Sequence, residues 1–374
     1  MQNPDWRLFS MIHRLSSLMA RAAKGEELTL AFLGGSITQG SLASTLETCY
    51  AFRVYDWFRR TFPQSCFHYV NGGIGGTNSH YGVSRAVTDV LMYQPDLVIV
   101  DFSVNDVSGS EGFELTGAGV ETTFFQETYE GTLRRLLAWP SSPAVLVLCN
   151  TQYSDGMNRE DIHVPVADHY GVPHVSVRDT IYADLLAGKY ALHDITPDGL
   201  HPNDPGHALV AEEIIRKLKE IAGMPCAPLP ASLPDPLTRN RFESARRLTI
   251  RNACPRLHGF RADTQEKTGL LDHFKNGWIG KQVGDRIHFD LENISTLAVQ
   301  YRKSVRHPAC VALLTLDGRE TVVLDGNFTE TWGDCLYLED VLDAAAPGAH
   351  TADLEIIEAA PDAVPFYLMS LIIS

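Results

Sequence analysis

Apolar runs of strand length alternate with amphipathic segments in the first 220 positions of the chain. The runs that have the length and composition of strands are 28–33, 66–70, 95–102, 144–149 and 172–177. Helical periodicity is clearest at 127–137 and 208–215. Strands that alternate with helices in this way predict an α/β fold with a parallel sheet between two helical layers, a three-layer α/β/α sandwich.

The pattern changes after position 222. Five prolines lie between positions 225 and 236, which predicts a stiff linker over 224–240. Short strand-like segments separated by turn signals follow at 247–250, 286–291, 296–301, 311–316, 321–324, 350–356 and 366–373. This spacing is typical of an all-β sandwich or jelly roll. We therefore expect an α/β domain over 1–223 and a β-sandwich domain over 241–374.

Composition and charge limit the partners of the chain. Among 374 residues, 44% are hydrophobic and 21% charged, as in ordinary globular proteins, and the formal net charge of −15 argues against nucleic acid and anionic membranes. Basic residues interrupt the apolar positions of segment 1–25, so we expect an amphipathic helix there and not a signal peptide. Seven scattered cysteines fit reduced thiols, and they show no metal-ligand spacing. A cytoplasmic protein without a metal site is the resulting expectation.

Ser36 is the first residue that indicates chemistry. It follows the apolar run 28–33 in the turn Gly34-Gly35-Ser36, where paired glycines let the chain bend sharply. Ligands of open α/β sheets bind at the carboxyl ends of the strands, so a serine there is well placed to act as a nucleophile. The alternative is a serine that only caps the following helix.

Asp198 and His201 form the second signal, three residues apart in a turn rich in proline and glycine. A serine hydroxyl is a poor nucleophile until a base takes its proton, and an acid partner fixes the tautomer of that base. The alternative is a hydrogen-bonded loop that caps the next helix.

Two further loops follow strand-like segments. The glycines of Gly72-Gly73-Ile74-Gly75-Gly76 allow backbone N–H groups to approach a ligand, although this loop lacks the lysine of a phosphate-binding loop. Asn105 follows the run 95–102, and its amide is a potential donor to an oxyanion at the same sheet edge as Ser36.

Taken together in chain order, these four blocks resemble the SGNH, or GDSL-like, hydrolase superfamily over roughly residues 25–220. The matching residues are Ser36, Gly76, Asn105, Asp198 and His201. One position departs from the pattern: the founding motif reads Gly-Asp-Ser-Leu, and this chain has Gly35 before the serine.

The resemblance implies a mechanism. Ser36 attacks an ester carbonyl, His201 takes its proton, and Asp198 orients His201. The oxyanion hole would consist of the N–H groups of Ser36 and Gly76 and the side chain of Asn105. An acyl-enzyme forms and is hydrolysed by water, and no cofactor is required.

The predicted β domain is similar to modules of bacterial carbohydrate esterases that help to bind glycan. Trp332, Trp278 and Asn276 are the candidate substrate-binding residues, because an indole face accepts a sugar ring and an amide binds hydroxyl groups. The alternative is that both tryptophans belong to the core of the domain. We expect Trp332→Ala to lower activity on acetylated oligosaccharides and to spare small aryl acetates.

The sequence therefore predicts a serine esterase that removes O-acetyl groups from oligosaccharides such as mannan or xylan fragments. A lysophospholipase or thioesterase would use the same catalytic residues, and a silent glycan-binding protein is a third hypothesis. The sequence leaves the oligomeric state open, with a homodimer as one hypothesis.

Overall fold

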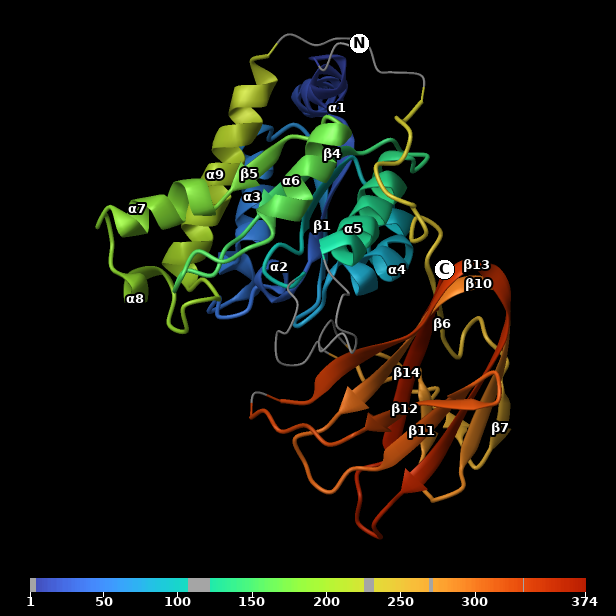
Figure 1. The fold of residues 1–374 in the computed structure, drawn as a ribbon. Coiled ribbons are helices and arrows are strands. Elements are labelled where there is room, and N and C mark those ends of the chain that lie inside the picture. The colour runs from blue at the N-terminus through green and yellow to red at the C-terminus, as the bar shows by residue number, and fades with distance from the viewer. Residues whose placement is uncertain (1–4, 107–121, 225–231, 269–271, 332) are drawn as a thin grey trace. The chain divides into compact units, whose positions relative to one another are not determined.

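Five strands of the N-terminal half form a parallel sheet with the order β2-β1-β3-β4-β5 (Figure 1). The computed structural model describes residues 5–106, 122–224, 232–268, 272–331 and 333–374. The strands are β1 (Glu27–Gly34), β2 (Cys66–Gly73), β3 (Leu97–Asp101), β4 (Ala144–Cys149) and β5 (His174–Ser176). All five overlap the predicted runs, although β2 extends beyond 66–70 and β5 is shorter than 172–177. Both β3 and β4 are buried throughout, as strands covered on both faces are.

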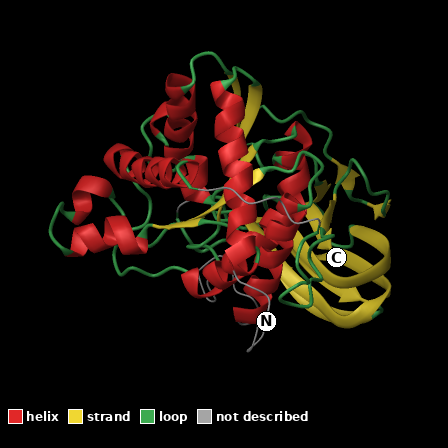
Figure 2. Cartoon of the chain, turned by 90° about the horizontal axis from the view of Figure 1, so that it is seen from above, coloured by secondary structure: helices red, strands yellow, loops and turns green. Residues whose placement is uncertain are grey.

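Helices cover both faces of this sheet (Figure 2). On one face α9 (Asp204–Ala222) packs against α1 (Asp5–Ala23) and α3 (Tyr50–Thr61), and on the other α5 (Thr122–Leu137) packs against α4 (Ser79–Asp89) and α6 (Glu160–His169). The short helices are α2 (Ser36–Gln39), η1 (Leu46–Thr48), η2 (Leu91–Tyr93), η3 (Arg178–Tyr182), α7 (Ala183–Leu186) and α8 (Leu192–Ile195). The predicted three-layer α/β/α sandwich is confirmed. None of the helices in the described part of the chain is both long and apolar enough to cross a bilayer.

Strand register brings the ends of three strands together. Gly34 of β1 pairs with Gly73 of β2 on one side and with Asp101 of β3 on the other. The loops that follow these three strands therefore begin side by side at the carboxyl edge of the sheet, where open α/β sheets bind ligands.

The C-terminal half is antiparallel and has its own hydrophobic core. Its strands are β6 (Arg246–Leu248), β7 (Arg256–His258), β8 (Arg261–Ala262), β9 (Trp278–Gly280), β10 (Arg286–Lys303), β11 (Val311–Leu316), β12 (Arg319–Asp325), β13 (Cys335–Glu358) and β14 (Phe366–Ile373). The main path runs β12-β11-β13-β10-β14-β9-β8, with β6 on β14 and β7 on β10. This confirms the predicted all-β fold.

The strand predictions need one correction here. Segments 286–291 and 296–301 were expected as two strands, but they belong to the single strand β10, whose pairing with β13 shifts register between Leu291 and Ile294. A β-bulge bends a strand without ending it, so the polar residues between the two apolar segments mark a bend and not a turn.

The two halves are separate compact units that meet in sequence at Glu243 and Ser244. Part of the proline-rich segment lies outside the described residues. Its C-terminal part packs on α5 of the first unit, where the carboxylate of Glu130 accepts hydrogen bonds from the N–H groups of Leu237 (2.5 Å) and Thr238 (2.8 Å).

Candidate active site

Ser36 lies where β1 gives way to α2. Ser36 is the first residue of α2, because the first helical hydrogen bond runs from the N–H of Gln39 to the carbonyl of Gly35 at 3.0 Å. The serine is 8% exposed, so its environment is set by the surrounding loops more than by solvent.

A continuous chain of hydrogen bonds connects three of the predicted residues. His201 Nε2 lies 2.8 Å from Ser36 Oγ, and His201 Nδ1 lies 2.7 Å from Asp198 Oδ2. Because the carboxylate accepts only from a protonated ring nitrogen, Nδ1 carries the proton in a neutral imidazole and Nε2 accepts from the serine hydroxyl. A proton acceptor is therefore in direct reach of the serine.

The Asp198 carboxylate is held ionised. Burial alone would raise the pKa of Asp198, but hydrogen bonds from the His201 ring and from the N–H groups of Leu200 (2.9 Å) and His201 (2.7 Å) outweigh it, so the pKa lies below its ordinary value. An ionised carboxylate at this point stabilises the imidazolium that forms when His201 takes a proton.

The turn that carries Asp198 and His201 is fixed from outside. The carbonyl of Gly199 accepts from the N–H groups of Tyr153 (2.7 Å) and Ser154 (3.0 Å) in the loop after β4. Asn203, and not Asp198, caps α9, with its side chain accepting from the N–H of Gly206 at 3.1 Å. The cap of α9 is thus Asn203, and Asp198 is left to contact His201.

Asn105 and Gly76 lie in the other two loops at this edge. The amide of Asn105 lies against the backbone before the serine, since a Cβ placed on Gly35 would be 2.2 Å from Asn105 Oδ1. Gly76 has a φ of +64°, a conformation that favours glycine. The departure at Gly35 has a steric explanation here, because a side chain at this position would require the Asn105 amide to move.

A buried arginine that the sequence analysis missed braces the same edge. Arg85 of α4 is fully buried and donates to the carbonyls of Gly34 (2.8 Å) and Gly72 (2.5 Å), near the ends of β1 and β2, and it pairs with Asp89 at 3.0 Å. No motif marks it, because an arginine on a helix is ordinary until its strand partners are known.

The structure does not support Trp278 as a sugar-binding residue. Trp278 is 1% exposed and packs edge-on against Phe289 in the core of the second unit, which contradicts the expected exposed indole face. Trp332 lies outside the described residues.

Asn276 serves its own turn. It adopts a φ of +65°, its Oδ1 accepts from Arg251 Nη2 at 2.9 Å, and its Nδ2 donates to the carbonyl of Gln265 at 2.6 Å. These contacts explain an asparagine in this turn without a sugar ligand.

Two further histidines of the first unit are buried and have partners of their own. His207 is buried, accepts from the N–H of Tyr50 (3.3 Å) and donates to the carbonyl of Ser41 (3.2 Å); burial lowers its pKa to about 4. These contacts give His207 a structural role. His163 is also buried and pairs with Asp106, a contact across 57 positions that no sequence pattern indicates.

Comparisons with known proteins agree with this geometry. The GDSL-like lipase/acylhydrolase family matches residues 32–209. The chain is similar to a two-domain esterase (CEX) active on acetylated mannans, whose crystal structure was determined with mannopentaose. The two chains are 44% identical, the TM-score is 0.88, and the match covers 96% of this chain and 94% of that chain. A second structure of that esterase gives 44% identity, a TM-score of 0.89, and coverage of 96% and 95%. No curated protein matched.

Proposed function

The chain belongs to the GDSL-like lipase/acylhydrolase family and is a carboxylic ester hydrolase, and on this basis we propose that it removes O-acetyl groups from mannan-type oligosaccharides with Ser36 as nucleophile. The observation that carries the proposal is the hydrogen-bonded chain from Asp198 through His201 to Ser36. The substrate class rests on the likeness to the acetylmannan esterase, which extends over 96% of this chain and so includes both units.

Acylation begins when Ser36 Oγ attacks the acetyl carbonyl carbon and His201 Nε2 takes the hydroxyl proton. Asp198 stabilises the resulting imidazolium through the 2.7 Å hydrogen bond to Nδ1. When the tetrahedral intermediate collapses, the bond between the carbonyl carbon and the sugar oxygen breaks, and His201 returns its proton to that oxygen. The products are the free sugar hydroxyl and an acetyl group on Ser36.

The negative charge of the intermediate needs donors at the sheet edge. We assign this role to the N–H groups of Ser36 and Gly76 and to the amide of Asn105, which the three loops after β1, β2 and β3 carry. Removal of one such donor usually costs about 10²–10³ in turnover.

Deacylation repeats the chemistry with water. His201 takes a proton from a water molecule that attacks the acetyl carbonyl, the bond to Ser36 Oγ breaks, and His201 returns the proton to the serine. Acetate leaves and the enzyme is restored.

Acetate release from acetylated mannan, xylan and glucan oligosaccharides tests the proposal. The same assay includes aryl esters with acyl chains of increasing length, and Ser36→Ala is the matched control. We expect release from the mannan series, with the variant inactive on every substrate.

Two results would overturn parts of this proposal. Activity on long-chain aryl esters alone would move the assignment to lipid or thioester hydrolysis. Binding of acetylated oligosaccharide without any acetate release would identify a catalytically silent glycan-binding protein.

A further inference from the structure

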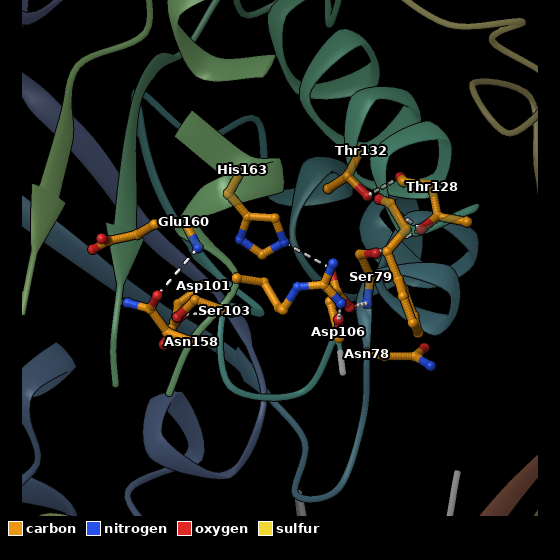
Figure 3. Close-up of polar contacts among 12 residues, drawn as sticks. Asn78, Ser79, Asp101, Ser103, Asp106, Thr128, Thr132, Asn158, Glu160 and His163 are labelled. Atoms are coloured by element: carbon orange, nitrogen blue, oxygen red, sulfur yellow. Dashed lines mark hydrogen bonds and ion pairs between the residues drawn. The ribbon is translucent and has the colours of Figure 1, made fainter. Parts of the chain in front are cut away.

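A second aspartate–histidine pair lies directly beside the proposed oxyanion hole. Asp106 is the residue after Asn105, and its Oδ2 lies 2.8 Å from His163 Nε2 of α6 (Figure 3). Both side chains are completely buried. The proposed chemistry uses neither residue.

The other oxygen of the same carboxylate reaches a different loop. Asp106 Oδ1 accepts from the N–H of Ser79 at 2.7 Å, and Ser79 is the first residue of α4, three positions after Gly76. One carboxylate therefore joins the loop that carries Asn105 to the loop that carries Gly76. These loops hold the two oxyanion donors that lie outside the serine turn.

Both ends of this link are anchored. Ser79 Oγ lies 2.6 Å from Thr128 Oγ1 of α5, which fixes the start of α4 (Figure 3). Arg159 Nη1 donates to the carbonyl of Asp106 at 2.7 Å, and the N–H of Arg159 donates to the carbonyl of Ser103 at 2.9 Å. The loop from Ser103 to Asp106 is thus held by its backbone as well as by the carboxylate.

His163 supplies one donor to Asp106 in a fixed direction. Its ring stacks on Tyr129 of α5 with 3.7 Å between ring centroids and 7° between planes. Within the described residues its Nδ1 is buried without a hydrogen-bond partner. A carboxylate oxygen accepts from a ring N–H, so it is the Nε2–H that donates to Asp106 Oδ2.

A buried carboxylate is a costly way to start a helix. Taking an ionised group out of water carries a penalty of several kcal/mol, which its hydrogen bonds must offset. A serine or asparagine side chain would accept from the N–H of Ser79 at far lower cost. Asp106 makes a second contact, to His163, that capping of α4 does not require, so the position of the Asp106 loop, and not only the start of α4, is being fixed.

We propose that Asp106, oriented by His163, is a positioning residue that sets the spacing between the Asn105 amide and the Gly76 N–H in the oxyanion hole. The inference rests on the proposed function, because this spacing matters only if an oxyanion forms there. Donors aimed at a developing charge lose their effect when they are displaced by about 1 Å. The effect of Asp106 on catalysis must therefore pass through Asn105 and Gly76.

A double-mutant cycle between Asp106→Ala and Asn105→Ala tests this on a small aryl acetate, with kcat, KM and melting temperature measured for each variant. We expect Asn105→Ala to lower kcat by about 10²–10³ and Asp106→Ala to lower it by about 10–10², both with little change in KM. In the Asn105→Ala background, Asp106→Ala should lower kcat by a clearly smaller factor than in the wild type, because only its effect through the Gly76 N–H remains.

Asp106→Asn provides the conservative control. Its amide oxygen can still accept from the N–H of Ser79, and its NH₂ can donate to His163 Nε2 in the other ring tautomer, so it should recover much of the kcat lost in Asp106→Ala. If Asp106→Ala does not fold, His163→Gln takes its place in the same cycle.

Equal losses from the Asp106 variant with and without Asn105, or a loss expressed mainly in KM, would overturn the inference. A different result concerns the proposed function itself. If Asn105→Ala keeps full kcat, the oxyanion assignment fails before the role of Asp106 arises, and the two failures are therefore distinguishable.

Discussion

Two of the aspartate–histidine pairs in the first unit have nearly equal geometry and very different surroundings. The pairs His201–Asp198 and His163–Asp106 have N···O distances of 2.7 and 2.8 Å. The first is partly exposed, with side-chain exposures of 23% and 44%, and the second is fully buried. The N···O distance within a pair therefore does not distinguish a catalytic base from a structural contact.

The second ring nitrogen makes the difference. His201 Nε2 faces the hydroxyl of Ser36, whereas His163 Nδ1 has no hydrogen-bond partner among the described residues. A histidine acts as a general base only where a proton to be moved lies in reach and the imidazolium is tolerated. A pair that is buried away from solvent can instead hold backbone segments in place. This is the role that we propose for His163 and Asp106.

Truncation of each histidine gives the largest expected contrast. We expect His201→Ala to lower kcat by about 10⁴ or more, since it removes the base, with little change in melting temperature. His163→Ala should lower kcat by less than about 10², but it should destabilise the fold by about 3–5 kcal/mol because it leaves a buried carboxylate without its partner. Steady-state kinetics and thermal unfolding of both variants measure this contrast. Equal kinetic losses in the two would contradict the division of roles.

Asp198→Asn is the next test, and it keeps the shape of the exposed pair. We expect a loss of about 10³–10⁴ in kcat, because the amide neither enforces the ring tautomer nor stabilises the imidazolium. Since hydrogen bonds hold the pKa of Asp198 below its ordinary value, wild-type activity should keep this charge as pH falls toward 4. A variant with near wild-type turnover at neutral pH would show that the ring orients itself without the carboxylate.

Restoring the acidic residue of the founding motif gives a smaller expected effect. Gly35→Asp places a side chain where a Cβ alone would be 2.2 Å from Asn105 Oδ1, so the Asn105 amide must move. We expect kcat to fall by about 10²–10³, as on loss of one oxyanion donor, and Gly35→Ala serves as the minimal variant. If Gly35→Asp is fully active on an aryl acetate, Asn105 does not define the oxyanion hole in this chain.

The smallest expected effect concerns His207 and the stability of the fold. Unlike His201 and His163, this histidine has no hydrogen bond to an aspartate in the described part of the chain. Burial lowers its pKa from 6.5 to about 4. Between pH 6.5 and pH 4, His207 is therefore protonated in the unfolded chain and neutral in the folded chain. Its contribution to stability is complete above pH 6.5 and falls by up to about 3 kcal/mol as pH decreases to 4.

Melting temperature as a function of pH, compared between wild type and His207→Gln, isolates this term. The variant should be less stable at neutral pH and should lose less stability on acidification. Parallel curves for the two proteins would show that His207 does not titrate in this range.

The sequence predicted those parts of the molecule that depend on local pattern. The apolar runs of β1, β3 and β4 and the turn before Ser36 have signals within a few residues, because buried parallel strands are continuously apolar. In the second unit β11 and β14 were predicted with their observed bounds. The N-terminal half of β13, Cys335–Glu358, was missed, and β10 was divided in two, because bulges interrupt the alternation on which strand prediction relies.

The long-range contacts of the site were not predictable from pattern. Arg85 meets the carbonyl of Gly34 across 51 positions and His163 meets Asp106 across 57, and each residue taken alone is ordinary on its helix. Trp278 shows the converse error: a tryptophan beside glycine and asparagine resembles an exposed aromatic turn, but its burial is decided by the strands that pair around it.

Trapping of the acyl-enzyme tests the central claim most directly. Wild-type protein mixed with a small aryl acetate is quenched in acid during turnover, digested and analysed by mass spectrometry, with Ser36→Ala treated in parallel. The account predicts one acetyl group on the peptide that contains Ser36 and none in the variant. Turnover by Ser36→Ala, or an acetyl group on another residue that turns over at the rate of the reaction, would contradict it.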